Sequence, residues 1–266
     1  MNQEVKQEVK NLIKIFNLKC TIEEFKDKVD WNLISCYQKL SEDFIREFKD
    51  KVDWLNISER QKLSENFVRE FKNFVNWKYI SFSQKLSEYF IREFQDKVDW
   101  YSISHSQKLS EDFIREFKDK VYWINVSECQ KLSVNFRKEF NLKIHKDNWI
   151  YKPVNFKLKR LKELNTYEII NDKYIIAYKG IRFDNYSKFN FQYKYEIGKT
   201  YEAHCDCNIK NQDSFGLSAW TLTGARNYCN QKIIKVKINI NDLGGIVHNG
   251  NKLRCKKFTV LEEVKD

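Results

Sequence analysis

The chain has 266 residues, of which 42% are hydrophobic, 15% aromatic and 32% charged, and its net charge is +11. This composition argues against an intrinsically disordered chain, because it supplies enough apolar surface for the core of one large or two ordinary domains. No apolar run approaches the length of about 18 residues that a membrane span needs, and the charged opening MNQEVKQEVKNLIKIF argues against a signal peptide, so we expect an intracellular protein that is not secreted.

The first half is predicted to be helical almost throughout. The only proline is Pro153, and all seven glycines fall at or after Gly180, so residues 1–150 lack the two residues that break helices most effectively. An irregular helix comes first, from about Val5 to Lys19. Most of the positive net charge belongs to residues 154–266 instead.

A 23-residue repeat follows, over about residues 20–145. Tryptophan recurs at this interval, as Trp31, Trp54, Trp77, Trp100 and Trp123, and so does the word QKLS, at 38–41, 61–64, 84–87, 107–110 and 130–133. Two phenylalanines and a valine then follow four residues apart, as in Phe44, Phe48 and Val52, a spacing that places them on one helical face. A fixed period of this length predicts a solenoid whose units bury their apolar faces by stacking.

Each repeat carries two helix-start signals, so each unit is predicted to be a helical hairpin. The longer helix is expected after Ser41, Ser64, Ser87, Ser110 and Ser133, and the shorter one after Asp30, Asp53, Asn76 and Asp99. The ends of a stack must depart from the repeat. At the C-terminal end Tyr122 replaces the capping aspartate, Val134 replaces an acidic residue, and Trp149 arrives 26 residues after the previous tryptophan.

Side chains vary mainly in the first and last turns of the shorter helix. The first-turn pairs are Asn32-Leu33, Leu55-Asn56, Lys78-Tyr79, Tyr101-Ser102 and Ile124-Asn125, and the last-turn pairs are Cys36-Tyr37, Glu59-Arg60, Phe82-Ser83, His105-Ser106 and Glu128-Cys129. Solenoids recognise partners through surfaces of variable side chains. We therefore expect a partner-binding face that includes Lys78, Tyr79, Phe82, Tyr101 and His105. The alternative is that these side chains vary only because they face solvent and are not under selection for binding.

The repeat words resemble a known group of sequences. LSEDFIREFKDKVDW, at residues 40–54, closely resembles the tandem repeats of uncharacterised proteins in giant DNA viruses of the mimivirus type, and the resemblance covers about residues 20–145. It implies a viral protein acting in the host cytoplasm. It implies no established activity.

A connector is expected at 148–166, and a small, β-rich α+β domain at 167–266. Runs such as YIIAYKG and KIIKVKINI predict strands, with glycines marking the turns between them. The words YKG (178–180), YKYEIGKTY (193–201) and FGLSAW (215–220) resemble an uncharacterised domain of giant-virus and phage proteins. That resemblance also implies no known chemistry.

Cysteines and histidines of this second half raise the question of a metal site. The seven cysteines of the chain are an odd number without a framework spacing, which predicts reduced thiols and agrees with an intracellular protein. Zinc could be held by His204, Cys205, Cys207 and Cys229, since thiolate and imidazole ligands suit it. However, the C-x-C spacing is not that of a zinc knuckle. The alternative is that these cysteines are small buried hydrophobes.

An enzymatic alternative comes from a remote resemblance to ADP-ribosyltransferases. Their plan of a basic residue, a serine-bearing middle strand and a late acidic residue could be laid on Arg182, Ser218 and Glu262, next to Glu263. The Ser-Thr-Ser word of that family is missing here, which leaves the assignment in doubt. No nucleotide-binding or metalloprotease signature occurs elsewhere in the chain.

A nucleic-acid partner is a further alternative, because the second half is basic. Its candidate residues are Lys232, Lys235, Lys237, Arg254, Lys256 and Lys257. The alternative without a binding role is that these residues form an ordinary solvated sheet surface.

Together these observations predict an α+β protein of two domains. An α-solenoid of 23-residue helical hairpins, within residues 1–147, precedes the small α+β domain. We expect a non-enzymatic scaffold that binds a host or viral protein through the repeat array. An enzyme or a nucleic-acid-binding module in the second domain is the rival hypothesis.

Overall fold

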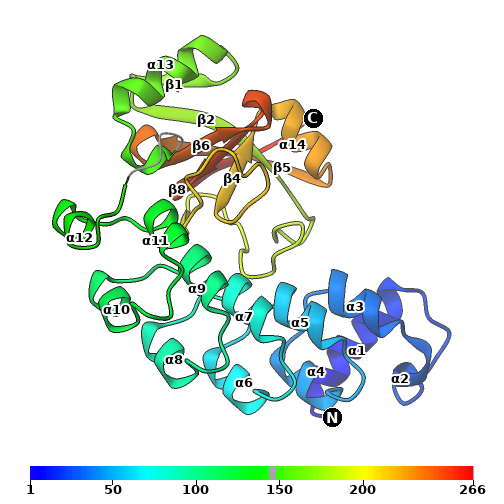
Figure 1. Ribbon diagram of the computed structural model, residues 1–266. Coiled ribbons are helices and arrows are strands. Elements are labelled where there is room, and N and C mark those ends of the chain that lie inside the picture. Colours follow the sequence, from blue (N-terminus) through cyan, green and yellow to red (C-terminus); the bar gives the residue numbers. More distant parts are fainter. Residues whose placement is uncertain (144–147, 266) are drawn as a thin grey trace. The chain divides into compact units, whose positions relative to one another are not determined.

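The computed structural model describes residues 1–143 and 148–265 and shows short repeating helices followed by an antiparallel sheet (Figure 1). The described chain forms two compact units. The first comprises Met1–Lys97 with Phe189–Gln192, and the second comprises Val98–Lys188 with Tyr193–Asp266. The array end predicted at residue 147 lies outside the described residues. Within the described residues, no helix is long and apolar enough to cross a membrane.

The first unit contains α1 (Gln3–Ile15), α2 (Phe25–Lys28) and three pairs of short helices. The pairs are α3 (Trp31–Tyr37) with α4 (Glu42–Glu47), α5 (Trp54–Arg60) with α6 (Glu65–Glu70), and α7 (Trp77–Ser83) with α8 (Glu88–Glu93). Each pair starts 23 residues after the pair before it, which confirms the predicted repeat of helical hairpins.

Serine and aspartate side chains cap these helices, as predicted. Ser64 Oγ accepts a hydrogen bond from Phe67 N (3.1 Å), and Asp53 Oδ1 accepts one from Asn56 N (2.9 Å). Each bond satisfies an N–H group that a helix start leaves unpaired. The preceding repeat adds another bond, because Ser64 N donates to Glu42 Oε1 (2.6 Å). Glu42 therefore holds the next repeat as well as occupying the first turn of its own helix.

The helix after each serine is shorter than predicted. α4 ends at Glu47 after 6 residues, whereas α3 has 7 residues, so the expectation that the serine-capped helix is the longer one was wrong. The backbone turns after Phe48, and the indole Nε1 of Trp54 donates to Lys49 O (2.9 Å). A continuing helix would use that carbonyl for its own hydrogen bond. The tryptophan of the next repeat thus binds the turn that follows the helix.

A buried glutamine links each repeat to the one before it. The side chain of Gln61, the first residue of QKLS, accepts from Leu40 N (3.0 Å) and donates to Gln38 O (2.7 Å) and Ser35 O (3.1 Å). Gln61 is fully buried, so these bonds satisfy backbone groups that water does not reach. The constant glutamine of the repeat is therefore an inter-repeat connector.

Helix α1 closes the N-terminal end of this stack. Val5, Val9 and Leu12 are buried along one of its faces. Glu8 Oε1 accepts from Ser41 N (3.0 Å), which is the bond that Glu42 makes to the serine of the following repeat. Burial raises the pKa of the Glu8 carboxyl, and the bonds from Ser41 oppose that rise.

The second unit contains the later repeats and the sheet. Its repeat helices are α9 (Trp100–Ser106), α10 (Glu111–Glu116), α11 (Trp123–Cys129) and α12 (Val134–Glu139). Asp99 caps α9 through Ser102 N (2.9 Å), whereas Tyr122 supplies no side-chain cap to α11. The predicted departure at Tyr122 is thus a missing cap, in a repeat where α11 still packs against α9.

The rest of the second unit is an antiparallel sheet with short helices. Its elements are η1 (Trp149–Tyr151), α13 (Val154–Leu164), β1 (Glu168–Ile170), β2 (Tyr174–Ile181), β3 (Thr200–Glu202), β4 (Leu217–Trp220), α14 (Leu222–Tyr228), β5 (Lys232–Asn239), η2 (Ile240–Asp242), β6 (Leu243–Val247), η3 (His248–Gly250), β7 (Lys252–Cys255) and β8 (Lys257–Val264). The strand order is β3-β8-β5-β2-β4-β7-β6, and β1 pairs with β2 outside this path.

Alternation along the strands builds the core of the sheet. Val236 and Ile238 of β5 are fully buried, while Lys235 and Lys237 between and beside them are partly exposed, which is the pattern expected of a strand with one buried face. Gly180 of β2 lies where α14 crosses the sheet. A Cβ there would lie 2.3 Å from Cys229 O, so only glycine permits this close approach.

Candidate functional site

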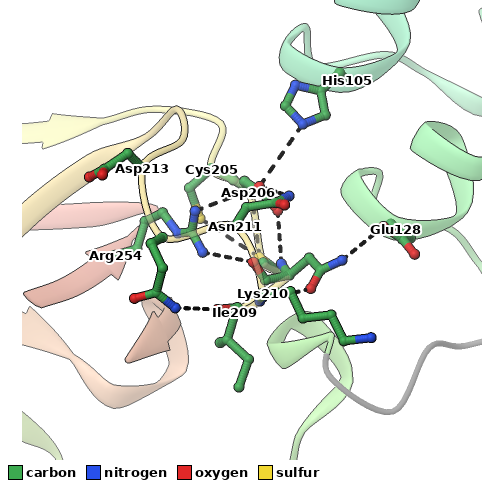
Figure 2. A network of polar contacts seen from close by, with 12 residues as sticks. His105, Glu128, Cys205, Asp206, Ile209, Lys210, Asn211, Asp213 and Arg254 are labelled. Carbon is green, nitrogen blue, oxygen red and sulfur yellow. Dashed lines mark hydrogen bonds and ion pairs between the residues drawn. The ribbon is translucent and has the colours of Figure 1, made fainter. Parts of the chain in front are cut away.

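A buried carboxylate, Asp206, organises the loop between β3 and β4 in the second unit (Figure 2). Its side chain is fully buried. Asp206 Oδ1 accepts from Asn208 N (2.8 Å), and Oδ2 accepts from Asn211 Nδ2 (2.7 Å). Because an aspartate readily bonds the backbone two residues further on, this sequence forms a local turn that holds the carboxylate inside the protein.

Arg254, on β7, is the cationic partner of this carboxylate. Its guanidinium is fully buried, with Nη1 3.6 Å from Asp206 Oδ2 and Nη2 donating to Asn208 O (2.9 Å). Among the described residues, Nε and Nη1 of Arg254 have no hydrogen-bond partner. A charge with so few bonds is costly to bury unless an opposite charge stays close. The Asp206–Arg254 pair is therefore an obligatory pair.

Two repeat helices of the second unit reach this pair. His105 of α9 lies with Nε2 3.9 Å from Asp206 Oδ2, and its ring centroid is 4.6 Å from that of Phe215. Burial lowers the pKa of His105, which favours the neutral imidazole. Glu128 of α11 accepts from Asn208 Nδ2 (2.9 Å) through its side chain. Figure 2 shows both helices turned toward the loop.

The arrangement favours a structural role over catalysis. Asp206 and Arg254 are closed off from solvent, so neither could reach a substrate in this conformation. What the network does is join the last turns of α9 and α11 to the sheet through charged and amide groups.

The predicted zinc ligands are not gathered into one set. Cys205 and Cys207 lie with their Sγ atoms 3.7 Å apart, but the His204 ring stacks on Phe215, and the Cys229 thiol donates to the backbone of β2. No group of three or more His, Cys, Asp or Glu side chains in the described chain is arranged to hold a metal ion. The thiols of Cys205, Cys207 and Cys229 are buried in the core.

The residues laid on the ADP-ribosyltransferase plan are also apart. Arg182 pairs with Asp184 (3.2 Å), and Glu262 pairs with Lys235 (3.3 Å). Ser218 lies on β4, and two strands, β5 and β2, separate β4 from the β8 strand that carries Glu262. At about 4.8 Å per strand, this places the two residues roughly 14 Å apart. They do not converge on one site.

Most of the basic residues considered for nucleic acid contact acidic or aromatic partners. The pairs are Lys232 with Glu263, Lys235 with Glu262 and Lys257 with Glu202, while Lys237 lies over the Tyr174 ring and Arg254 is buried. Lys256 is half-buried. This distribution does not concentrate unpaired positive charge on one face, as phosphate binding would require.

The variable positions of the repeat separate into two classes. Of the last-turn residues, His105 contacts Phe215 and Asp206 in the second unit, and Phe82 precedes Ser83, whose carbonyl accepts from Gln192 in the first unit. Of the first-turn residues, Lys78 and Tyr101 are exposed, and Tyr79 is half-buried. The residue directly after the tryptophan thus faces solvent, whereas the next residue is half-buried at Tyr79 and buried at Ser102. Among the last-turn residues, Ser83 and His105 contact other segments of this chain, while Tyr37 is exposed.

Sequence reasoning missed Asp206 and Arg254 as a pair and Glu128 as their neighbour. Asp206 stands between two candidate zinc ligands, Cys205 and Cys207, and Arg254 is one of the basic residues considered for nucleic acid. Their pairing joins residues 48 positions apart and leaves no local signal.

Comparisons of the chain with protein-family models, with curated proteins and with solved structures found no match.

Proposed function

We propose that this chain is a non-enzymatic interaction protein that binds a protein partner through the residue following the tryptophan of each repeat. This post-tryptophan position holds Asn32, Leu55, Lys78, Tyr101 and Ile124, and all five are exposed. Its side chains change from repeat to repeat while the packing residues stay constant. Such a division supports recognition by repeats that share one packing scheme and differ in their exposed side chains.

One patch in the second unit carries the proposal. Tyr101 is 50% exposed, Tyr122 is 52% exposed and Ile124 is 75% exposed, on the neighbouring helices α9 and α11. The Tyr101 and Tyr122 rings meet edge to face, 5.5 Å between centroids. Exposed apolar side chains that cluster, rather than scatter singly, mark interaction sites. Tyrosine is also enriched among the residues that dominate binding energy.

The free cysteines of the chain support a partner in the cytoplasm. All seven cysteines are free thiols, which fits a reducing compartment. On the resemblance of the repeat words to giant-virus proteins, we propose that the partner is a host or viral protein in the infected cytoplasm. No second function is proposed, because neither the ADP-ribosyltransferase residues nor the basic residues converge on a site.

A binding experiment with matched variants tests the proposal. The tagged wild-type chain and a Tyr101→Ser/Ile124→Ser variant would each be used to capture proteins from host cells. Each captured protein would then be purified and titrated against both chains. Loss of two contact side chains should weaken direct binding by at least tenfold, since each 1.4 kcal/mol is about a factor of ten.

The control removes equally exposed side chains elsewhere. Tyr89 of α8 and Val134 of α12 are 71% and 70% exposed and do not occupy the post-tryptophan position. A Tyr89→Ser/Val134→Ser variant should bind as the wild type does. Equal affinities for the Tyr101→Ser/Ile124→Ser variant and the wild type would reject the proposal, provided that both chains melt at similar temperatures.

A further inference from the structure

The segment Phe189–Gln192 belongs to the first unit, although its neighbours in the chain belong to the second. It lies across the C-terminal ends of two short repeat helices. Phe191 N donates to Arg60 O of α5 (3.2 Å), and the side-chain amide of Gln192 donates to Ser83 O of α7. The segment therefore engages the same position of two successive repeats.

These carbonyl groups are the ones that a helix end leaves without partners. At the end of α5, Ile57 O accepts from Gln61 N, and Ser58 O accepts from the Gln84 side chain (3.0 Å). Arg60 O is completed by Phe191 N. The repeat architecture thus satisfies the inner carbonyls itself and leaves the last one for another segment. A peptide that forms a tight turn and keeps an N–H group free to donate has the right chemistry to fill it.

Side chains add selectivity to this backbone contact. Phe191 is 1% exposed, and the Cζ atom of Arg60 lies 5.6 Å from the centroid of the Phe189 ring. Asn190 Oδ1 accepts from Gln192 N (2.9 Å), which fixes the turn of the segment. A guanidinium over an aromatic ring is a favourable pair. Arg60 is the only arginine at this position of the repeat, because its equivalents are Tyr37, Ser83, Ser106 and Cys129.

The segment leaves room beside itself. A cavity of about 350 Å³ is lined by Glu59, Arg60, Ser83, Phe189 and Asn190. Phe189 remains 44% exposed at its edge. The cavity is open to solvent, so an incoming peptide could contact Glu59, Arg60 and Ser83 beside the bound segment.

We propose that the C-terminal ends of α5 and α7 form a binding site for a turn-forming peptide with the pattern Phe-Asn-Phe-Gln, in which the asparagine side chain closes the turn. The segment Phe189–Gln192 is its occupant within this chain, and a partner segment of the same chemistry displaces it. This site and the Tyr101 patch consist of different residues, so different variants test the two proposals.

A synthetic peptide tests this site directly. The probe is a fluorescein-labelled peptide of residues 187–194, SKFNFQYK, added to the full chain and followed by fluorescence anisotropy. A Phe191→Ser/Gln192→Ala chain has its internal occupant weakened and should bind the peptide at least tenfold more tightly than the wild type. Adding Arg60→Ala to that chain should weaken binding again by at least fivefold. Equal binding by all three chains would overturn the proposal.

Changes in the peptide keep the test independent of protein folding. N-methylation of the amide equivalent to Phe191 removes the donor to Arg60 O, and should reduce binding at least tenfold. A scrambled peptide should not bind. A photo-reactive group at the Phe189 position should crosslink, in the unmodified wild-type chain, to residues 59–60 or 82–83. Equal binding by the N-methylated peptide, or crosslinks confined to other residues, would refute the site.

Discussion

At the scale of single residues, the Asp206–Arg254 pair is the feature with the largest expected energetic effect. Neither side chain can be rehydrated while the fold persists, so removing one charge leaves the other buried and unpaired. We predict that Asp206→Asn and Arg254→Met each lower the free energy of unfolding by about 3–5 kcal/mol. The double variant should lose at least about 1 kcal/mol less than the sum, because it removes both charges. Urea denaturation measures all three values.

A surface aspartate of the second unit provides the control. Asp112 of α10 is 95% exposed at its side chain and pairs with Arg115 (2.9 Å), which is 37% exposed. Asp112→Asn should cost below about 1 kcal/mol, as exposed ion pairs do. Additive losses in the Asp206→Asn/Arg254→Met variant would show that the two charges do not depend on each other.

His204 makes stability depend on pH. Burial, followed by the nearby positive charge of Lys256, lowers its pKa from 6.5 to about 4, and His105, Lys108 and Asp206 also face it. The unfolded chain therefore binds more protons than the folded chain between pH 6.5 and 4. By linkage, the free energy of unfolding falls as the pH is lowered through this window, by at most about 3 kcal/mol.

The variant His204→Gln should remove this pH dependence. Its free energy of unfolding should change less between pH 7 and pH 4 than that of the wild type, because glutamine does not titrate. Chemical denaturation at several pH values measures the two curves. Parallel curves would contradict the assignment to His204.

At the scale of the elements, the buried glutamine decides how strongly one repeat holds the next. Gln61→Ala would leave Leu40 N, Gln38 O and Ser35 O without their partner. Each buried group left unpaired costs about 1–3 kcal/mol. We predict a loss of about 3 kcal/mol in the free energy of unfolding, measured by urea denaturation.

The adjacent residue of the QKLS word is a matched control. Lys62 is exposed, and Lys62→Ala should change stability by less than about 0.5 kcal/mol. Equal losses at Gln61 and Lys62 would mean that the glutamine is not the connector between the repeats.

At the scale of the whole molecule, the last repeat of the array is closed by Tyr151, which makes the hydrogen bonds that the QKLS glutamine of a following repeat would make. Tyr151 Oη donates to Gln130 O (3.2 Å) and accepts from Leu132 N (3.4 Å), as the glutamine of a following repeat would. Arg137 stands where earlier repeats bury isoleucine or valine, and its Nε donates to the same hydroxyl (3.0 Å). Polar groups thus replace the next apolar layer and stop the stacking.

Tyr151→Phe should therefore loosen this end of the array. We predict a loss of about 1–2 kcal/mol, with faster amide hydrogen exchange at residues 130–132 than in the wild type. Tyr122→Phe changes an exposed tyrosine of the same unit and should leave exchange at these residues unaltered. Unchanged exchange in Tyr151→Phe would rule out the capping role.

The repeat, the helix starts and the β-rich second half follow from the amino-acid sequence alone. These depend on short-range chemistry: a serine or aspartate caps the helix that it precedes, and alternation in the run around Val236 selects one buried face of a strand. The ends of the array were visible in sequence as departures such as Tyr122. The sequence does not show that Tyr151 takes the place of the next repeat's glutamine. A tyrosine hydroxyl can make the same hydrogen bonds as a glutamine amide, but the two residues share no sequence pattern.

Where helices stop and which variable residues face solvent depend on side-chain bonds and packing in the folded chain. The helix before Phe48 ends at Glu47, and Trp54 of the next repeat binds the Lys49 carbonyl in the turn that follows, a side-chain bond that backbone propensity does not encode. For the same reason the Asp206–Arg254 pair escaped prediction. Tyr101 faces solvent, whereas His105 packs against the loop between β3 and β4. The sequence does not distinguish these two environments, because both residues are variable and both lie in the same short helix.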